Sequence, residues 1–365
     1  MTGAEDMRFM RVALGLGRRG QGNTWPNPAV GCVITQDARI IGRGWTQRGG
    51  RPHAETQALA QAGKGAKGAT AHVTLEPCAH HGHTPPCATA LIEAGISRVV
   101  VAADDPDPRV AGRGSGMLRA AGVEVVTGVL REDATHDLAG FLSRVERGRP
   151  ELLLKLATSF DGRIATAGGQ SQWITGPGAR RIVHAMRARF DAVMVGAGTV
   201  RADDPMLTVR GMGARHQPVR IVVSRRLSLP LMSRLAQTAR EVPLWLIHGS
   251  EADPASIAAW ESVGARLIAC PRKEEGLDMA AAMHALGAAG LTRVFCEGGG
   301  ALAASLLRAG VVDRLAGFTA GLALGADGKA GIGSLGLQSL EAAPRFVLER
   351  VQDVGGDVLH LWRRA

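Results

Sequence analysis

The sequence contains no tyrosine, and aromatic residues make up only 4% of its 365 residues. Proteins that bind single-stranded nucleic acid stack the bases on aromatic side chains, so this composition argues against such a surface. No run of five or more lysines and arginines occurs either, although the formal net charge is +10. Dispersed arginines are more typical of a protein that binds phosphorylated small molecules.

Long apolar runs are also absent, and none reaches the roughly 18 residues that cross a bilayer. The N-terminal segment, MTGAEDMRFMRVALGLGRRG, carries its acids before its arginines and lacks the pattern of a signal peptide. We therefore expect a cytoplasmic protein without a membrane partner. The five cysteines are too few for a disulfide scaffold at this length, so a close pair of them indicates metal binding or catalysis.

Short apolar runs alternate with helical patterns along the whole chain, which predicts an α/β fold. In the first half, strands are expected at 29–35, 39–45, 72–76, 98–103 and 123–128, and helices near 5–17, 53–62, 85–94, 114–121 and 131–146. In the second half, strands are expected at 152–157, 192–198, 218–224, 243–249, 265–270 and 293–299, and an antiparallel pair around Gly355 and Gly356. The first two strands form a hairpin around Gln36 and Asp37, and the later ones of that half run parallel through helical crossovers.

The length of the chain predicts two domains. The polar segment RVERGRPE (144–151) follows a predicted helix and precedes a predicted strand, and it contains glycine and proline. Such a segment is typical of a link between domains, so we divide the chain into domains 1–147 and 148–365.

Two motifs in the first half contain the ligands of a zinc site. PHAETQALA (52–60) places His53 at a predicted helix start, because proline is tolerated in a first helical turn. EPCAHHGHTPPC (76–87) places Cys78 after a strand and Cys87 in the first turn of another helix. A catalytic zinc takes three protein ligands and leaves a fourth position for water, and these three side chains are of the right types.

The same residues also have ordinary explanations. His-Ala-Glu at a helix start is often a surface turn, Cys-x8-Cys is a weak signal alone, and His80, His81 and His83 are compatible with a solvated loop. Yet the order of these motifs is that of a zinc deaminase: His-x-Glu, a strand, Pro-Cys and then a second cysteine. The second cysteine lies in a predicted helix for which Thr84 is the expected N-cap. In that class Glu55 lies outside the metal shell and carries protons.

Together with TWPNPAVGCVI (24–34) and GRPHAE (50–55), the long cysteine spacing resembles the family of bifunctional riboflavin-biosynthesis deaminase/reductases, over essentially the whole chain. The resemblance implies an N-terminal cytidine-deaminase-like αβα sandwich and a C-terminal dihydrofolate-reductase-like domain. It implies zinc-dependent deamination of 2,5-diamino-6-(5-phosphoribosylamino)pyrimidin-4-one, followed by NADPH-dependent reduction of the ribosyl group to ribityl. One position departs from the family, which often has histidine in place of Thr46.

In the deaminase half, the resemblance retains the three zinc ligands and assigns catalysis to Glu55. This carboxylate takes a proton from the attacking water, gives one to the ring nitrogen and later protonates the departing ammonia. Asn27, in Pro-Asn-Pro, matches a family position beside the substrate, although the same tripeptide also fits a plain turn.

In the second half, MVGAGTVRADDP (194–205) and FCEGGGALAASLL (295–307) each place glycines after a strand, where backbone N–H groups can approach a phosphate. Neither matches the full dinucleotide-binding pattern, so tight turns also explain them. The resemblance implies that NADPH contacts Ala157, Trp173, Thr199, Asp203, Gly299, Gly300, Ala301, Leu302, Ala303, Ala304 and Ser305. It implies that the substrate contacts Ser171, Arg187, Leu207, Arg210 and Glu297, and arginines suit its 5′-phosphate because guanidinium binds phosphate bidentately.

Two further expectations concern the reductase half. Lys155 and Glu297 are candidates for proton transfer. Ser224 and Arg225 stand where the family often has Asp-Ser, so Arg225 or Arg226 is a candidate contact of the NADPH 2′-phosphate.

Two other functions stay open from the sequence. One is a zinc deaminase whose second half only binds a ligand or serves as a scaffold, and bound NADPH would argue against it. The other is a deaminase that edits nucleic acid, which a steep salt dependence of oligonucleotide binding would favour. We expect an enzyme with a small phosphorylated pyrimidine as substrate, no nucleic-acid partner, and a homo-oligomer whose subunit number the sequence leaves open.

Overall fold

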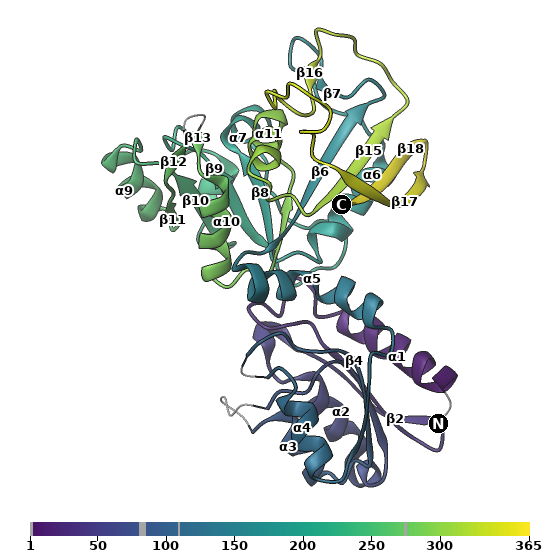
Figure 1. Ribbon diagram of the computed structural model, residues 1–365. Helices are drawn as coiled ribbons and strands as arrows, with labels where there is room; N and C mark the ends of the chain where they lie inside the picture. The colour runs from purple at the N-terminus through teal and green to yellow at the C-terminus, as the bar shows by residue number, and fades with distance from the viewer. Residues whose placement is uncertain (1–2, 80–84, 109, 274–275) are drawn as a thin grey trace. The chain divides into compact units, whose positions relative to one another are not determined.

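The computed structural model describes residues 3–79, 85–108, 110–273 and 276–365 (Figure 1). The chain divides into two compact units, Met1–Gly148 and Arg149–Ala365. Within the described ranges, no helix combines the length and the apolar character that crossing a bilayer requires.

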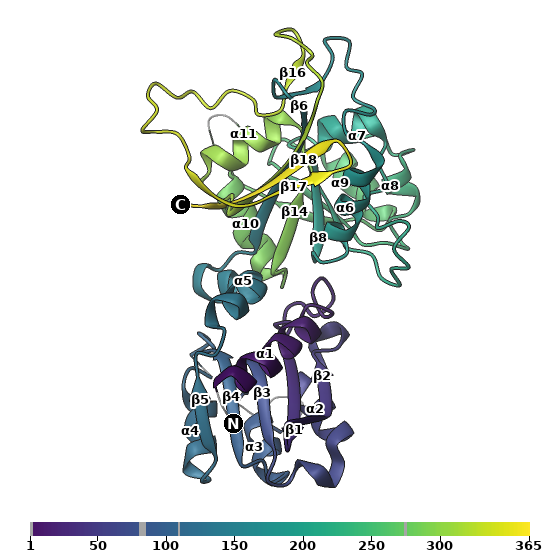
Figure 2. The same cartoon turned by 90° about the vertical axis from the view of Figure 1, so that its right-hand side faces the viewer.

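The first unit is a five-stranded sheet with helices on both faces (Figure 2). Helices α1 and α5 cover one face, and α2, α3 and α4 cover the other. Strand β1 is antiparallel to β2 and β3, whereas β3, β4 and β5 are parallel. The strands, in the spatial order β2-β1-β3-β4-β5, are β1 (Gly31–Gln36), β2 (Arg39–Trp45), β3 (Thr70–Leu75), β4 (Arg98–Ala103) and β5 (Glu124–Thr127). The helices are α1 (Gly3–Gly17), α2 (Ala54–Ala62), α3 (Cys87–Glu93), α4 (Arg113–Ala120) and α5 (Arg131–Arg147), with 3-10 turns at Arg48–Gly50 and Gly63–Ala66.

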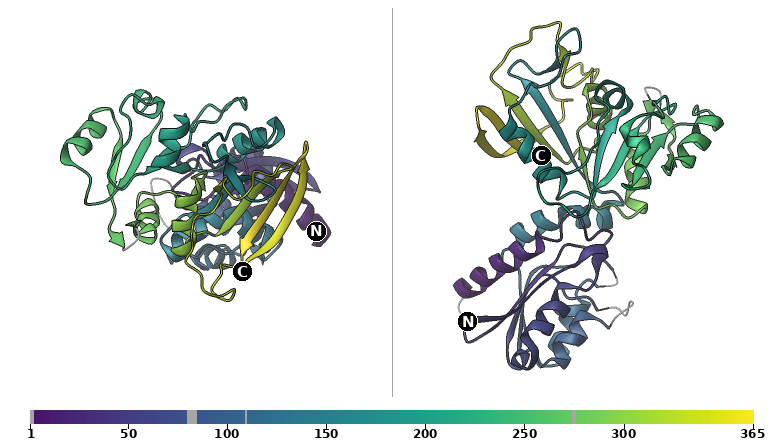
Figure 3. Two further views of the ribbon diagram at one scale, coloured as in Figure 1. Left: turned by 90° about the horizontal axis from the view of Figure 1, so that it is seen from above. Right: turned by 180° about the vertical axis from the view of Figure 1, so that it is seen from behind.

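The second unit is built on a nine-stranded sheet, in which β11 and β17 are the two edges (Figure 3). Its spatial order is β11-β10-β9-β8-β14-β6-β15-β18-β17, parallel from β11 to β15 and antiparallel from β15 to β17. The strands are β6 (Glu151–Ser159), β8 (Ala192–Gly196), β9 (Val219–Val223), β10 (Leu244–His248), β11 (Arg266–Ala269), β14 (Arg293–Cys296), β15 (Arg314–Ala320), β17 (Phe346–Val354) and β18 (Asp357–Arg364). Two small pairs are β7 (Arg163–Ala165) with β16 (Lys329–Ala330), and β12 (Arg272–Lys273) with β13 (Gly276–Leu277). The helices are α6 (Pro177–Arg187), α7 (Ala197–Asp203), α8 (Arg234–Gln237), α9 (Pro254–Ser262), α10 (Met279–Ala288) and α11 (Gly300–Arg308).

The sheet topology explains where the second unit can hold a ligand. Strands β6, β8 and β14 are parallel neighbours, so their carboxyl ends reach the same edge of the sheet. The glycine-containing segments that lead into α7 and α11 follow β8 and β14 at this edge. Ligands of open α/β sheets usually bind at such an edge.

The α/β prediction is confirmed, and β2 and β4 have the predicted bounds. The predicted hairpin is also confirmed, with Asp37 and Ala38 at positive φ in its turn. Strand β15 was missed, because RLAGFTA has few β-branched residues and is specified by its neighbours β6 and β18.

The predicted start of the helix at 85 is wrong, since α3 begins at Cys87. The physical reason is that Pro86 disfavours helical backbone at the residue before it. Thr84, the expected N-cap, lies outside the described residues, as do His80, His81 and His83.

Candidate active sites

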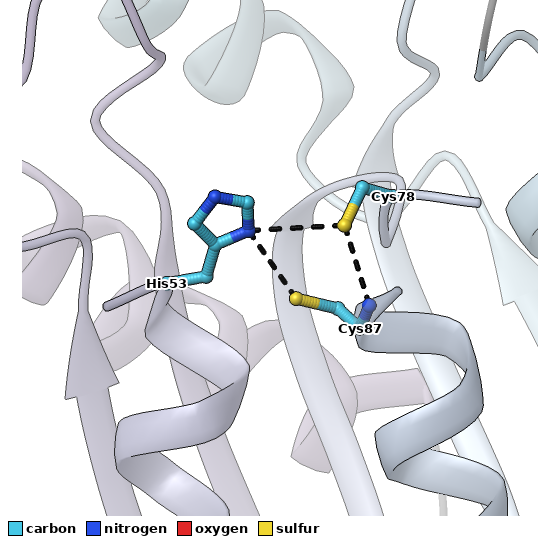
Figure 4. Close-up of side chains that lie close together, drawn as sticks. All are labelled: His53, Cys78 and Cys87. Carbon is cyan, nitrogen blue, oxygen red and sulfur yellow. Dashed lines mark hydrogen bonds between the residues drawn. The ribbon is translucent and has the colours of Figure 1, made fainter. Parts of the chain in front are cut away.

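His53, Cys78 and Cys87 lie close together in the first unit (Figure 4). His53 is the residue before α2, Cys87 is the first residue of α3, and Cys78 follows β3. The ligand atoms of the three side chains all lie within 4.8 Å of one another. Two helix starts and one strand end thus converge on a point where an ion could bind.

The distances in this cluster fit a tetrahedral zinc. With bonds of about 2.0–2.1 Å to nitrogen and about 2.3 Å to sulfur, tetrahedral angles place nitrogen and sulfur about 3.6 Å apart. His53 Nδ1 lies 3.8 Å from the Cys78 sulfur and 3.3 Å from the Cys87 sulfur, on either side of that value. The Cys87 backbone N–H also donates to the Cys78 sulfur at 3.3 Å, which is the kind of support that a metal-binding thiolate receives.

The electrostatics of the cluster favour a cation. The hydrogen bond from the Cys87 thiol outweighs burial and, with that from His53, lowers the pKa of Cys78 to about 4. The hydrogen bond of the Cys87 thiol with Cys78, together with burial, raises the pKa of Cys87. The hydrogen bond between His53 and Cys78 raises the pKa of His53. The cluster therefore holds protons between close ligand atoms, and a divalent cation displaces such protons when it binds.

Glu55 lies in the first turn of α2 and is only 4% exposed. Burial, and then the negative charge of Cys78, raises the pKa of its carboxyl. A carboxyl whose pKa is raised towards neutrality can both accept and return a proton, which is the requirement for a general acid/base. Glu55 is therefore suited to move protons beside the cluster.

Sequence reasoning missed Glu76, which positions the segment that carries Cys78. Its buried carboxylate accepts two backbone N–H groups at the start of α4, at 2.9 and 3.0 Å. A Cβ on Gly114, in α4, would lie 1.9 Å from the Pro77 carbonyl oxygen, so only glycine permits this approach. The signal in the sequence was Glu-Pro-Cys followed by the glycine-rich run VAGRGSG.

Asn27 and Thr46 have different surroundings in the first unit. A Cβ on Gly50, whose φ is +85°, would lie 1.7 Å from Asn27 Nδ2, so the Asn27 side chain packs against Gly50. Gly50 is three residues before His53 in the sequence. Thr46 is buried, and its hydroxyl accepts the Val30 backbone N–H at 3.0 Å. The Thr46 side chain is thus hydrogen-bonded to the backbone of Val30.

The second unit contains a cavity of about 830 Å³ at the carboxyl edge of its sheet. Residues of β6, β7, α6, β8, α7, α11 and β16 line it, together with the segment that follows β14. The lining cations are Lys155, Arg180, Arg187, Arg210, Arg234 and Lys329, and the lining carboxylates are Asp203, Asp204 and Glu297. The excess of positive side chains suits an anionic ligand.

Arg187 and Glu297 form a buried ion pair in this cavity. Arg187 donates from Nε to one carboxylate oxygen at 2.5 Å and from Nη2 to the other at 3.1 Å, while Nη1 donates to the Thr208 carbonyl at 2.8 Å. Three of the five guanidinium N–H groups are thus used, which leaves one on each Nη for a ligand. Burial alone would raise the pKa of Glu297, but Arg187 and Lys155 lower it below its usual value.

Lys155 lies in β6 and lines the same cavity. Burial lowers the pKa of its ammonium, while the negative charge of Glu297 opposes this shift. A lysine with a lowered pKa releases a proton more readily than an exposed one. Lys155 and Glu297 therefore form an electrostatically linked pair suited to proton transfer.

The loop after α7 brings Leu207 and Arg210 to the cavity. Asp204 and Leu207 have positive φ angles of 39° and 55°, a conformation that side chains with a Cβ adopt rarely and mainly where surrounding contacts hold it. The Arg210 backbone N–H donates to His184 Nδ1 at 3.1 Å, which ties the loop to α6. Ser171 lines the cavity from the segment before α6.

Comparison with known proteins identifies the family. The chain matches the cytidine and deoxycytidylate deaminase zinc-binding region over residues 4–103 and the RibD C-terminal domain over residues 150–360. It is 42% identical to the riboflavin biosynthesis protein RibD of Escherichia coli (strain K12), over 98% of this chain and 99% of that protein. The chain belongs to the RibD family. It is therefore a bifunctional enzyme of riboflavin biosynthesis, a deaminase joined to a reductase.

Solved RibD structures have the same fold over the full length. Acinetobacter baumannii RibD superposes with a TM-score of 0.89 at 35% identity, and the chains cover each other completely. A deaminase/reductase from Thermotoga maritima, described as acting on diaminohydroxyphosphoribosylaminopyrimidine and 5-amino-6-(5-phosphoribosylamino)uracil, gives 0.88 at 32% identity, again with complete coverage. The RibD family suggests a nicotinamide cofactor for the second unit.

The structure brings most, but not all, of the predicted cofactor residues of this RibD-family chain to the cavity. Those that line it are Ala157, Trp173, Thr199, Asp203, Gly299, Gly300, Ala301 and Leu302. Ala303, Ala304 and Ser305 do not, because the helical repeat of α11 turns Ala303 and Ala304 into the core. The Ser305 hydroxyl donates to the Ala301 carbonyl instead.

The predicted 2′-phosphate contacts lie outside this cavity. Ser224 is buried, and Arg225 faces Glu251 with 3.9 Å between their charged atoms. Arg225 and Arg226 follow β9, one strand away from β8 in the sheet. Their contact with a cofactor stays a prediction.

Proposed function

We propose that residues 1–147 deaminate 2,5-diamino-6-(5-phosphoribosylamino)pyrimidin-4-one with zinc, and that residues 148–365 reduce the ribosyl group of the product with NADPH. The observation that carries the first part is the tetrahedral spacing of His53, Cys78 and Cys87 beside a buried Glu55. The second part is supported by the cation-rich cavity beside the glycines that precede α11. The cytoplasmic location, the homo-oligomeric state and the absence of a nucleic-acid partner stay predictions from the sequence.

In the deaminase site, His53, Cys78 and Cys87 would hold zinc, which when bound lowers the pKa of water to about 7. Glu55 accepts the proton that water loses on attacking the amino-bearing ring carbon. The carboxyl gives that proton to the ring nitrogen, takes a second proton from the newly added hydroxyl as the carbonyl forms, and gives this second proton to the departing amino group, which leaves as ammonia. Asn27, packed against Gly50, contacts the pyrimidine.

In the reductase site, NADPH when bound supplies the hydride that converts the open-chain sugar carbon to a CH₂ group. Lys155 gives a proton to the ribose ring oxygen as the ring opens, and Glu297 stabilises its ammonium before that transfer. Arg187 orients Glu297 and offers its two remaining N–H groups to the substrate. Arg210 binds the 5′-phosphate together with those free N–H groups of Arg187, and Ser171 contacts the substrate.

The zinc assignment predicts a metal content. Protein purified without chelators should contain about one zinc per chain, because three protein ligands hold a catalytic zinc. Cys87→Ala should lose most of this zinc, whereas Cys270→Ala, a control in the second unit, should retain it. Elemental analysis of the three proteins provides the measurement. Absence of zinc from the wild type would exclude the site, and full retention by Cys87→Ala would exclude this ligand.

The phosphate assignment predicts a loss of reductase efficiency in Arg210→Ala. Charge-assisted bonds of this kind contribute about 1.5–3 kcal/mol, so kcat/KM should fall roughly ten- to a hundredfold. Arg210→Lys should recover part, since lysine retains the charge without the planar fork. Arg215→Ala, an exposed position in the same loop and outside the cavity lining, should change little.

The measurement compares reductase kinetics on phosphorylated and dephosphorylated substrates. NADP+ binding should stay the same in each variant. If Arg210→Ala lowers the efficiency equally on both substrates, Arg210 does not bind the phosphate.

A further inference from the structure

Most cations of the reductase cavity already have a partner within the chain. Arg187 binds Glu297, and Arg234 lies 3.6 Å from Asp204. The charge of Glu297 also acts on Lys155. Arg187 and Lys155 thus share the carboxylate of Glu297, and Arg234 has an exposed carboxylate beside it, so each of these three cations has a negative group near it before a ligand arrives.

The other three lining cations differ from one another. Arg180 stacks on Trp173 at 4.5 Å and donates to the Thr175 carbonyl. Arg210 and Lys329 have no side-chain hydrogen bond or ion pair with any part of the chain that the structure describes. Arg210 is assigned to the substrate phosphate above. Lys329 is left as a cation without an assigned function.

Lys329 belongs to residues 321–334, a segment that we name the strap. Hydrogen bonds from its backbone N–H groups attach the strap to the turn between β6 and β7 and to the start of α11, which lines the cavity. The Asp161 carboxylate accepts two of its N–H groups, at 2.7 and 3.1 Å, and the Gly162 carbonyl accepts a third at 2.9 Å. A fourth donates to the Gly300 carbonyl at 2.9 Å, at the start of α11.

These attachments lie on both sides of Lys329 along the chain. The strap also pairs with β7 through β16, where Lys329 is opposite Ala165. A Cβ on Gly300 would lie 2.5 Å from the Ala330 carbonyl oxygen, so the strap lies directly against α11. The Lys329 ammonium reaches the loop before Ser171, because a Cβ on Gly169 would lie only 3.1 Å from Nζ. The backbone of Lys329 is therefore fixed while its charge stays available at the cavity.

We propose that Lys329 binds a phosphate group of a ligand in the reductase cavity, an inference that rests on the proposed reductase function. An ammonium binds phosphate as a point charge, without the geometric demands of a guanidinium. Two ligands of this site carry such groups. One is the dinucleotide, through its pyrophosphate, and the other is the substrate, through its 5′-phosphate.

The test compares Lys329→Met with Lys273→Met, a control whose exposed lysine pairs with Asp278 outside the cavity. NADP+ is titrated calorimetrically into each full-length protein without substrate, and reductase KM is measured with phosphorylated and dephosphorylated substrates. Lys329→Met should either weaken NADP+ binding roughly tenfold or raise the reductase KM for the phosphorylated substrate roughly tenfold. Lys329→Arg should restore part of that loss, and Lys273→Met should match the wild type. The affected ligand identifies the source of the phosphate.

Three results would overturn the proposal. The first is unchanged NADP+ binding together with an unchanged KM in Lys329→Met. The second is an equal loss in Lys329→Met and Lys329→Arg, since a packing role would then explain both. The third is a lowered melting temperature of Lys329→Met that accounts for its weaker binding. A wild-type protein that binds no NADP+ would overturn the cofactor assignment itself, which separates that failure from a failure of Lys329 alone.

Discussion

Glu55→Gln should abolish deamination while zinc stays in place. The amide retains the size of the side chain but cannot accept and return a proton, and general acid/base groups contribute about a hundredfold to ten-thousandfold in rate. Glu55 is buried beside the ligand cluster, and its raised pKa places proton transfer nearer to neutral pH. Ammonia release from the pyrimidine and zinc content are measured on the same preparation.

The same variant separates the two activities. NADPH-dependent reduction of substrate that has already been deaminated should proceed at the wild-type rate, because the proposed reductase cavity lies in the second unit. Glu76→Gln is an informative comparison, since it perturbs the segment that carries Cys78 and should lower both zinc content and deamination. If Glu55→Gln loses its zinc as well, Glu55 is a ligand and the assigned proton-transfer role is wrong.

Glu297→Gln should lower reductase kcat at least a hundredfold, since proton-transfer groups contribute on that scale. The substitution removes the negative charge that Arg187 binds at 2.5 and 3.1 Å and that acts on Lys155. Deamination should be unaffected. Glutamine has nearly the same shape and can still accept from Arg187, so thermal unfolding should show a folded protein.

The pH profile of this variant provides a sharper test. The Glu297 carboxylate stabilises the protonated Lys155 and so raises its pKa against the effect of burial. Without that charge, the Lys155 pKa falls further. If protonated Lys155 donates the proton, the limb on which reductase kcat declines with rising pH must move to lower pH in Glu297→Gln. Lys155→Met should lack that limb, and an unmoved limb would assign the proton to another group.

Local patterns predicted much of the fold. β2 and β4 were predicted with their observed bounds, because apolar runs flanked by turn residues read clearly as strands. β15 was not, since its seven residues form a strand only between β6 and β18. The start of α3 was predicted too early because Thr84 was the expected N-cap. Pro86 disfavours helical backbone at the residue before it, so the helix begins at Cys87.

The candidate zinc ligands His53, Cys78 and Cys87 could be predicted from the sequence, because His-x-Glu and Pro-Cys are local motifs. The role of Glu76 was not, because its partners at the start of α4 come more than thirty residues later. Glycine-rich turns alone did not distinguish a cofactor site from tight turns. The cavity is lined by Gly299 and Gly300 but not by Ser305, which only the tertiary structure shows.

By itself, the sequence determined the α/β class, the candidate zinc ligands and Glu55 as the candidate proton carrier, since each depends on residues close together in the chain. Only the tertiary structure decided which cations of the second unit are paired and which line the cavity. Arg187 is 110 residues from the carboxylate that it binds, and Lys329 reaches the cavity through hydrogen bonds between distant segments. Charge pairing of this kind depends on distances of a few ångströms, which no local pattern specifies.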